Sequence, residues 1–173
     1  GYVTAKAGIK VVLIDRDQEA ADKGKATSAD LITKDMQKGR ATQADKEALL
    51  SLSEATPDYD KLADCDLVIE AVFEDLAVKQ QVLREVEAAA PDAIFASNTS
   101  TIPIREIATG AKHPERVIGM HYFSPVPRMP LLEVIASDVS SPRAVATACA
   151  FGTAQGKTVI VVRDGPGFYT TRI

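Results

Sequence analysis

Two residues twelve positions apart, His121 and Glu133, could form an acid–base pair. His121 ends the apolar run at residues 117–120, and Glu133 interrupts a second apolar run at 131–135. An ionised carboxylate inside a buried strand needs a hydrogen-bonded partner, which an imidazole could supply. A carboxylate that accepts from one ring nitrogen fixes the histidine tautomer, raises the basicity of the other nitrogen and stabilises the imidazolium formed on proton uptake. The alternative is a structural histidine and a glutamate exposed on an edge strand.

A polar run at residues 97–101 follows a further apolar segment, 93–96, and precedes Pro103. Hydroxyl and amide groups at the end of a strand, such as that of Ser100, can face a substrate carbonyl group. Polar runs of this kind also serve as helix caps and turns. The run by itself leaves both interpretations open.

Asp15 ends a third apolar run, 11–14, after a glycine turn at Gly8. Dinucleotide-binding folds place at this point the carboxylate that accepts hydrogen bonds from the adenosine ribose. A solvated or helix-capping aspartate would occupy the same position. Residues 1–7 are typical of the later part of a helix, and no glycine-rich phosphate loop precedes them. We therefore expect the chain to begin after that loop or to keep only Gly1 of it.

Glu70 and Glu74 flank the end of a fourth apolar segment, 66–72, and Lys79 lies on the helix predicted after it. One interpretation is that Glu74 and Lys79 face a cofactor. The other is that they form a solvated ion pair five residues apart.

Short apolar segments alternate with amphipathic helical segments along the sequence. The pattern predicts strands at residues 11–14, 66–72, 93–97, 117–121, 131–135 and 158–162. It predicts helices at residues 76–89, from Pro103, and at 141–155. The polar stretch 17–52, with a break near Gly39 and a cap at Thr42, predicts a helical hairpin. The alternation indicates an α/β domain with a mainly parallel sheet, whose ligands lie at the carboxyl ends of the strands.

The composition limits the number of domains, the kinds of partner and the kinds of site that the chain can have. With 173 residues, 46% of them hydrophobic, the chain can bury one sizeable core, so we predict one domain. A net charge of −4 argues against nucleic acid and anionic lipid as partners. No apolar stretch is long enough to span a membrane and the N-terminus shows no signal-peptide pattern, which predicts an intracellular soluble protein. Cys65 and Cys149 lack metal-ligand spacing, so we interpret them as free thiols and predict no metal site.

Four ordered motifs carry a resemblance to a known family. They are VIEAVFEDL at residues 68–76, IFASNTS at 94–100, VIGMHYFSPV at 117–126 and DGPGFYTTR at 164–172. These motifs resemble those of the 3-hydroxyacyl-CoA dehydrogenases. Within that family the chain is similar to the dehydrogenase part of the large subunit of the multifunctional fatty-acid oxidation complex, of the trifunctional-protein type.

The resemblance implies a Rossmann-like fold: a mainly parallel, doubly wound sheet with a helical hairpin insertion, followed in the family by a helical domain. On this basis we expect residues 1–173 to be a single, truncated NAD-binding domain. The first strand, the glycine loop and the helical domain would lie outside it.

The resemblance also implies NAD as cofactor and acyl-CoA as substrate. His121 would take the proton of the 3-hydroxyl group of a (3S)-3-hydroxyacyl-CoA while C3 gives a hydride to NAD, which yields the 3-ketoacyl-CoA of fatty-acid β-oxidation. Glu133 would orient His121, and Ser100 would bind the substrate oxygen. Asp15 would bind the adenosine ribose, and Glu74, Lys79, Ser100 and Ser124 would lie around the rest of the cofactor. Lys38 would bind the CoA phosphates.

Thr171 departs from part of the family. Single-function members have Asn within a Val-Asn-Arg run at this position, whereas Thr-Thr-Arg resembles the trifunctional type. Thr171 is therefore a fourth candidate catalytic residue without an assigned role.

Two other functions are alternatives to this one. A truncated chain could be a non-catalytic nucleotide-fold shell, inactive without the glycine loop and the helical domain. A dehydrogenase of β-hydroxy acids without CoA would need a catalytic lysine motif that the sequence lacks. For the family member we expect a homo-oligomer or a complex with a thiolase subunit, in the bacterial cytoplasm or the mitochondrial matrix.

Overall fold

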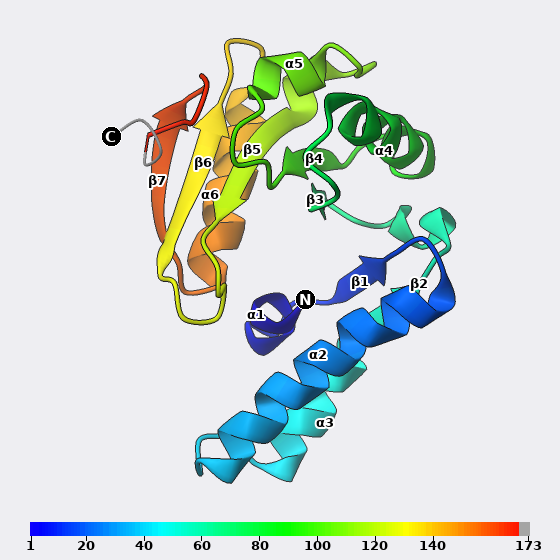
Figure 1. Cartoon of the computed structure of the whole chain (residues 1–173), viewed down its shortest axis with the longest axis vertical. Helices are drawn as coiled ribbons and strands as arrows, with labels where there is room; N and C mark the ends of the chain where they lie inside the picture. Colours follow the sequence, from blue (N-terminus) through cyan, green and yellow to red (C-terminus); the bar gives the residue numbers. More distant parts are fainter. Residues whose placement is uncertain (170–173) are drawn as a thin grey trace. The chain divides into compact units, whose positions relative to one another are not determined.

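The computed structural model describes residues 1–169, which divide into two compact units (Figure 1). The first unit is Gly1–Lys61, and the second begins at Leu62. The prediction that residues 1–173 form one domain stays a prediction, as does Thr171, which lies outside the described residues.

The first unit pairs two short parallel strands with three helices. Its elements are α1 (Tyr2–Lys6), β1 (Val11–Ile14), α2 (Gln18–Gln37), α3 (Gln43–Ser51) and β2 (Ser53–Thr56). A 3-10 turn, η1 (Tyr59–Leu62), follows them. The sequence predicted α1, β1 and both long helices but missed β2, whose residues are mostly polar.

The helical hairpin of α2 and α3 is confirmed, and its caps explain where each helix begins. The Asp17 carboxylate accepts from the N–H of Ala20 at the start of α2. Thr42 and Asp45 form a reciprocal capping box at the start of α3. Between the helices Gly39 has φ of +67°, a left-handed conformation that favours glycine.

The second unit is a five-stranded sheet with helices on both faces. Its elements are β3 (Leu67–Glu70), α4 (Leu76–Ala89), β4 (Ile94–Ser97), α5 (Ile104–Ala108), η2 (Pro114–Arg116), β5 (Val117–Tyr122), β6 (Leu131–Ala136), α6 (Pro142–Ala154) and β7 (Thr158–Arg163). The strand order is β3-β4-β5-β6-β7. The α-helices and strands of this unit were predicted, although β3 is shorter than expected, whereas η2 lies in a stretch that the sequence predicted to be a loop.

The direction of the sheet changes once. Strands β3, β4 and β5 are parallel, β6 is antiparallel to β5, and β7 is parallel to β6. The α/β class with a mainly parallel sheet is confirmed. The reversal at β6 was not predicted. It pairs β6 with the part of β5 that contains the candidate residue His121.

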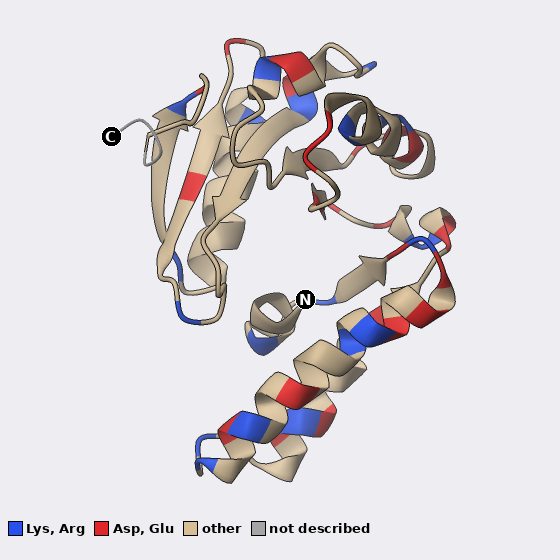
Figure 2. Cartoon of the chain, viewed as in Figure 1, with Lys and Arg blue, Asp and Glu red and all other residues tan. Residues whose placement is uncertain are grey.

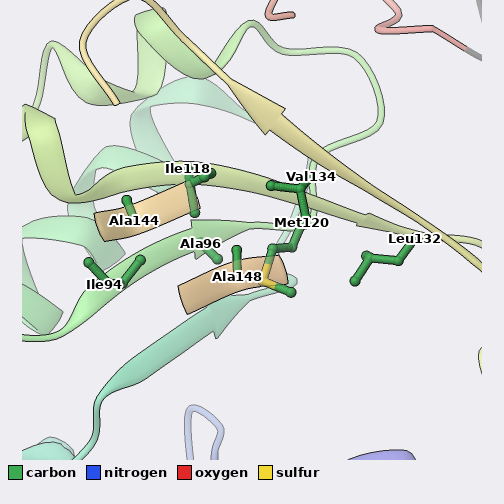
Figure 3. Close-up of a cluster of buried hydrophobic side chains, with 8 residues drawn as sticks. All are labelled: Ile94, Ala96, Ile118, Met120, Leu132, Val134, Ala144 and Ala148. Carbon is green, nitrogen blue, oxygen red and sulfur yellow. The ribbon is translucent and has the colours of Figure 1, made fainter. Parts of the chain in front are cut away.

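An apolar core lies between α6 and one face of the sheet (Figure 3). Small residues of α6 allow this close packing: a Cβ at Gly152 would lie 2.5 Å from Cδ2 of Leu132. The core side chains are Ile94, Ala96, Ile118, Met120, Leu132, Val134, Ala144 and Ala148.

Charged residues concentrate on the helices and loops, and acidic residues interrupt the strands at few places (Figure 2). The acidic residue of β6 is Glu133, which is fully buried. Cys65 and Cys149 are free thiols, both only partly buried. In the part of the chain that the structure describes, no helix is long and apolar enough to cross a membrane.

Candidate active site

His121 and Glu133 form a buried hydrogen-bonded pair on neighbouring strands. The two residues are directly opposite each other in the register of β5 and β6, so their side chains leave the same face of the sheet. Nδ1 of His121 lies 2.7 Å from Oε2 of Glu133. His121 is 8% exposed and Glu133 is fully buried. This contact has the geometry that the sequence predicted for an acid–base pair.

The imidazole ring of His121 is also held by aromatic neighbours. The Phe123 ring centroid lies 4.5 Å from that of the imidazole, and the Phe168 centroid lies 5.9 Å away. Among the residues that the structure describes, Nε2 of His121 has no hydrogen-bond partner. With Nδ1 bound to Glu133, Nε2 is the nitrogen that can exchange a proton with a ligand.

Lys79 lies at the centre of a second buried polar cluster, where β3 leads into α4. Its ammonium is 3.1 Å from both carboxylate oxygens of Glu70, and both side chains are 1% exposed. Glu70 also accepts the hydroxyl hydrogen of Ser97. Nζ of Lys79 lies 3.3 Å from Oε2 of Glu74. Lys79 is therefore buried and paired. The Glu74–Lys79 ion pair considered from the sequence forms, but with a buried rather than a solvated lysine.

Glu74 organises the polar run that follows β4. Its Oε1 accepts from the hydroxyl of Thr99 at 2.5 Å, from the N–H of Ser100 at 2.9 Å, and from the N–H and hydroxyl of Thr101 at 3.1 and 3.0 Å. Burial raises the pKa of Glu74, but the hydrogen bonds from these residues and the nearby Lys79 ammonium outweigh it and lower the pKa to about 2. Glu74 is thus a fixed anion at the edge of the sheet.

Ser100 is exposed at the end of the polar run, and Asn98 joins the run to β5. The Ser100 hydroxyl is 3.4 Å from Oε1 of Glu74, a long hydrogen bond that leaves it able to turn to a ligand. Oδ1 of Asn98 accepts from the N–H of Tyr122, and its own N–H donates to the carbonyl of Glu70. Asn98 therefore ties together the ends of three strands beside His121.

The two polar clusters share one face of the same sheet. Glu70 is opposite Ser97, and Ser97 is opposite Gly119, in the parallel register of β3, β4 and β5. His121 is two residues beyond Gly119, so it points to the same side. This is the face opposite the α6 core, and it carries Glu70, Ser97, His121 and Glu133. The structure therefore brings the His121–Glu133 pair and the Glu70–Ser97 pair to one face of the sheet.

The other candidates lie apart from these contacts. Asp15 is exposed at the carboxyl end of β1, where its Oδ1 accepts from the N–H of Arg16 at 2.8 Å. Lys38 is exposed at the end of α2. Ser124 is exposed in the connection between β5 and β6. Asp15 and Lys38 belong to the first unit, and Ser124 belongs to the second.

Sequence reasoning missed the partners that hold the candidate residues. The sequence indicated Glu70 only as an acid at the end of a strand. Glu70 is nevertheless a carboxylate at the end of a buried strand, much as Glu133 is a carboxylate within one. The argument that a buried carboxylate needs a partner would have pointed to Lys79. Asn98 gave no signal of this kind, because its contact with Tyr122 depends on the pairing of β4 with β5. No group of His, Cys, Asp and Glu within the described part of the chain could hold a metal ion.

Comparison with known proteins identifies the family. Residues 1–165 match the family model described as 3-hydroxyacyl-CoA dehydrogenase, NAD binding domain. The fatty acid oxidation complex subunit alpha of Shewanella loihica is 47% identical over 171 residues, which are 98% of this chain and 24% of that protein. The chain thus spans about a quarter of the length of this relative.

Solved structures agree in fold. The (S)-3-hydroxybutyryl-CoA dehydrogenase of Ralstonia eutropha is 36% identical with a TM-score of 0.96, over 99% of this chain and 61% of that one. The dehydrogenase part of a multifunctional enzyme from C. elegans is 26% identical with a TM-score of 0.81, over 93% of this chain and 37% of that one. The predicted Rossmann-like fold is confirmed, and so is the predicted cofactor at the level of the family, which binds NAD. The chain belongs to the NAD-binding domain family of the 3-hydroxyacyl-CoA dehydrogenases.

Proposed function

We propose that this chain carries the NAD-binding part and the acid–base pair of an enzyme that oxidises (3S)-3-hydroxyacyl-CoA to 3-ketoacyl-CoA in fatty-acid β-oxidation. The observation that carries the proposal is the buried pair of His121 and Glu133, 2.7 Å apart, in a chain of this family. A buried imidazole with one nitrogen bound to a carboxylate and the other unbonded within the described chain is suited to general-base chemistry.

Two carboxylates, those of Asp15 and Glu74, have the chemistry to bind a dinucleotide cofactor. Asp15 offers an exposed carboxylate at the end of a parallel strand, where ribose hydroxyl groups would be bound. Glu74 offers a second carboxylate, already fixed by hydrogen bonds from residues 99–101. When bound, NAD accepts the hydride that leaves C3 of the substrate. In this proposal Lys79 acts through Glu74, because its ammonium is buried against Glu70 and Glu74.

His121 would take the proton of the 3-hydroxyl group at Nε2. Glu133 would hold the ring through Nδ1 and stabilise the imidazolium that results. The exposed hydroxyl of Ser100 would donate to the substrate oxygen, which becomes the ketone, and Ser124 would face the cofactor. Lys38, exposed on the helical hairpin, is the proposed contact for the CoA phosphates.

The proposal extends to the partners of the whole protein and to its location in the cell. The similar protein from Shewanella is named as subunit alpha of a fatty acid oxidation complex. We therefore propose that the protein acts in such a complex, with a thiolase subunit or a second copy as partner. A bacterial relative favours the bacterial cytoplasm over the mitochondrial matrix.

The test compares two histidine substitutions in the full-length protein, with acetoacetyl-CoA and NADH as substrates. His121→Gln is expected to lower kcat by about 10²- to 10⁴-fold, the usual contribution of a general base. His113→Gln is the matched control, because His113 is exposed and its Nδ1 lies 3.3 Å from a carboxylate oxygen of Glu115. It should leave kcat unchanged.

Calorimetric titration with NAD separates this proposal from a non-catalytic shell. Both variants should bind NAD as the wild type does. A His121→Gln variant with wild-type turnover, or a wild type that binds NAD without turnover, would contradict the proposed function.

A further inference from the structure

Asp164 anchors the segment that follows β7 to two other elements. Its N–H donates to the carbonyl of Ala136 at 3.0 Å. Its carboxylate accepts from the N–H of Ile104 and the N–H of Arg105, both at 2.8 Å. Asp164 therefore ties the end of β7 to the end of β6 and to the first turn of α5.

A turn carries the chain from Asp164 into the interior. The N–H of Phe168 donates to the carbonyl of Gly165 at 3.1 Å, which closes the turn. Gly167 and Phe168 have φ of +73° and +48°. Glycine adopts this left-handed conformation readily, but an aromatic residue does so only when its surroundings impose it.

The left-handed backbone at Phe168 turns its ring inward. Phe168 is 1% exposed, whereas the next residue, Tyr169, is 63% exposed. An apolar residue that only fills a core can do so with ordinary backbone angles. The position of this ring therefore calls for an explanation beyond burial.

The ring of Phe168 lies against the imidazole of His121. Its centroid is 5.9 Å from that of His121, and Phe123 contacts the imidazole at 4.5 Å. Glu133 binds Nδ1 of the same ring. The imidazole is thus held by one hydrogen bond and by two aromatic rings contributed by separate segments of the chain.

We propose that Phe168 is a positioning residue for His121, held in place by Asp164 and the turn at residues 165–168. With Phe123 it keeps the imidazole in the orientation that the Nδ1–Glu133 hydrogen bond requires, and it keeps water away from that bond. This inference rests on the proposed function in assigning catalytic importance to His121, but the contacts it explains do not depend on that function.

The direct test follows the Nδ1 proton of His121 by ¹⁵N-edited NMR of the full-length protein, with the signal assigned by its loss in His121→Gln. In Phe168→Ala we expect this proton to exchange with water at least about threefold faster, because shielded hydrogen bonds exchange slowly. Phe168→Leu, which keeps an apolar side chain, should fall between Phe168→Ala and wild type. Tyr169→Ala removes the neighbouring exposed aromatic ring and should leave the exchange rate unchanged.

Kinetics on the same proteins give the second readout. In Phe168→Ala kcat should fall about 10- to 100-fold, the range produced by misplacing a catalytic group, while KM for NAD stays at its wild-type value. Wild-type exchange of the Nδ1 proton in every Phe168 variant that folds would overturn the inference, and Phe168→Leu decides if Phe168→Ala is unfolded. The proposed function fails separately, if the wild type has no dehydrogenase activity.

Discussion

His121 and Glu133 are directly opposite each other on β5 and β6, and this pairing exists because the two strands run in opposite directions. The eleven residues between them in sequence include a short connection at residues 123–130. A fully parallel continuation of the sheet would have needed a long crossover before the next strand. The reversal therefore brings the carboxylate to the base with little intervening chain.

Glu133→Gln should lower kcat in the full-length protein by about 10²- to 10⁴-fold, because the neutral amide cannot stabilise the imidazolium. KM for NAD should stay unchanged. Glu133→Asp keeps the charge but shortens the side chain, so its kcat should be intermediate. Glu115→Gln, which removes the acid beside the exposed His113, is the control. Wild-type kcat in Glu133→Gln would show that the pair is structural.

Lys79→Met should lower the free energy of unfolding by about 3–5 kcal/mol, because it leaves the buried carboxylate of Glu70 without its counter-ion. Urea denaturation measures the change. Adding Glu70→Gln should recover part of the loss, since the uncompensated charge is then gone. Lys23→Met breaks the exposed pair with Glu19 and should cost at most about 1 kcal/mol. Equal effects at the two lysines would contradict the buried ion pair.

Glu74 should make stability depend on pH in acid solution. Its pKa is about 2 in the folded protein against an ordinary value of 4.5. The folded-state pKa is depressed, so the stabilisation is fully present above pH 4.5 and is lost as the pH falls toward 2. The carboxylate is partly exposed, and solvent screening keeps the effect modest.

Urea denaturation at pH values across this window gives the measurement for Glu74. The free energy of unfolding should fall less steeply with decreasing pH in Glu74→Gln than in the wild type. Glu85→Gln removes an acid of α4 that accepts a side-chain hydrogen bond from Gln81, and serves as control. The same pH slope in Glu74→Gln and wild type would refute the assignment.

Gly119→Ala should destabilise the second unit by about 1–3 kcal/mol through overpacking. An added Cβ would lie 2.8 Å from Cδ1 of Ile104 and 2.8 Å from Cβ of Ile135. Ile104→Val, which removes Cδ1, should relieve part of the cost in the double variant.

Gly24→Ala is the matched control for Gly119→Ala. Gly24 lies within α2, and an added Cβ there meets no atom within 4 Å. Alanine is the better helix former, so this substitution should stabilise the protein by about 0.5–1 kcal/mol. Thermal unfolding of both variants distinguishes the two outcomes by sign, and a neutral Gly119→Ala would argue against the close packing of α5 on β5.

The periodicity of the sequence was sufficient to predict most elements of this fold. Some signals are local. The apolar run Val11–Ile14 is one, and the capping box that begins at Thr42 is another. β2 was missed because Ser53–Thr56 has no apolar run and is a strand only through its pairing with β1. The antiparallel direction of β6 was missed for a similar reason, since an apolar run has no direction until it pairs.

The candidate site was predictable where a residue was anomalous in its own surroundings. A carboxylate inside an apolar run, Glu133, predicted that a hydrogen-bonded partner must lie beside it, and the structure has His121 in that place. Lys79 gave a misleading signal, because a lysine on an amphipathic helix is usually exposed, and only the packing of α4 on β3 buries it. Phe168 gave no polar signal at all, since its role depends on a backbone conformation that the sequence does not display.

Chain entropy distinguishes the two buried polar pairs on this face of the sheet. Glu70 and Ser97 are 27 positions apart and meet only after the α4 crossover has formed. His121 and Glu133 are 12 positions apart, and joining them closes a much shorter loop, whose entropic cost is lower. The contact between His121 and Glu133 thus needs only the pairing of β5 with β6. It does not need the α4 crossover, which must form before Glu70 can meet Ser97.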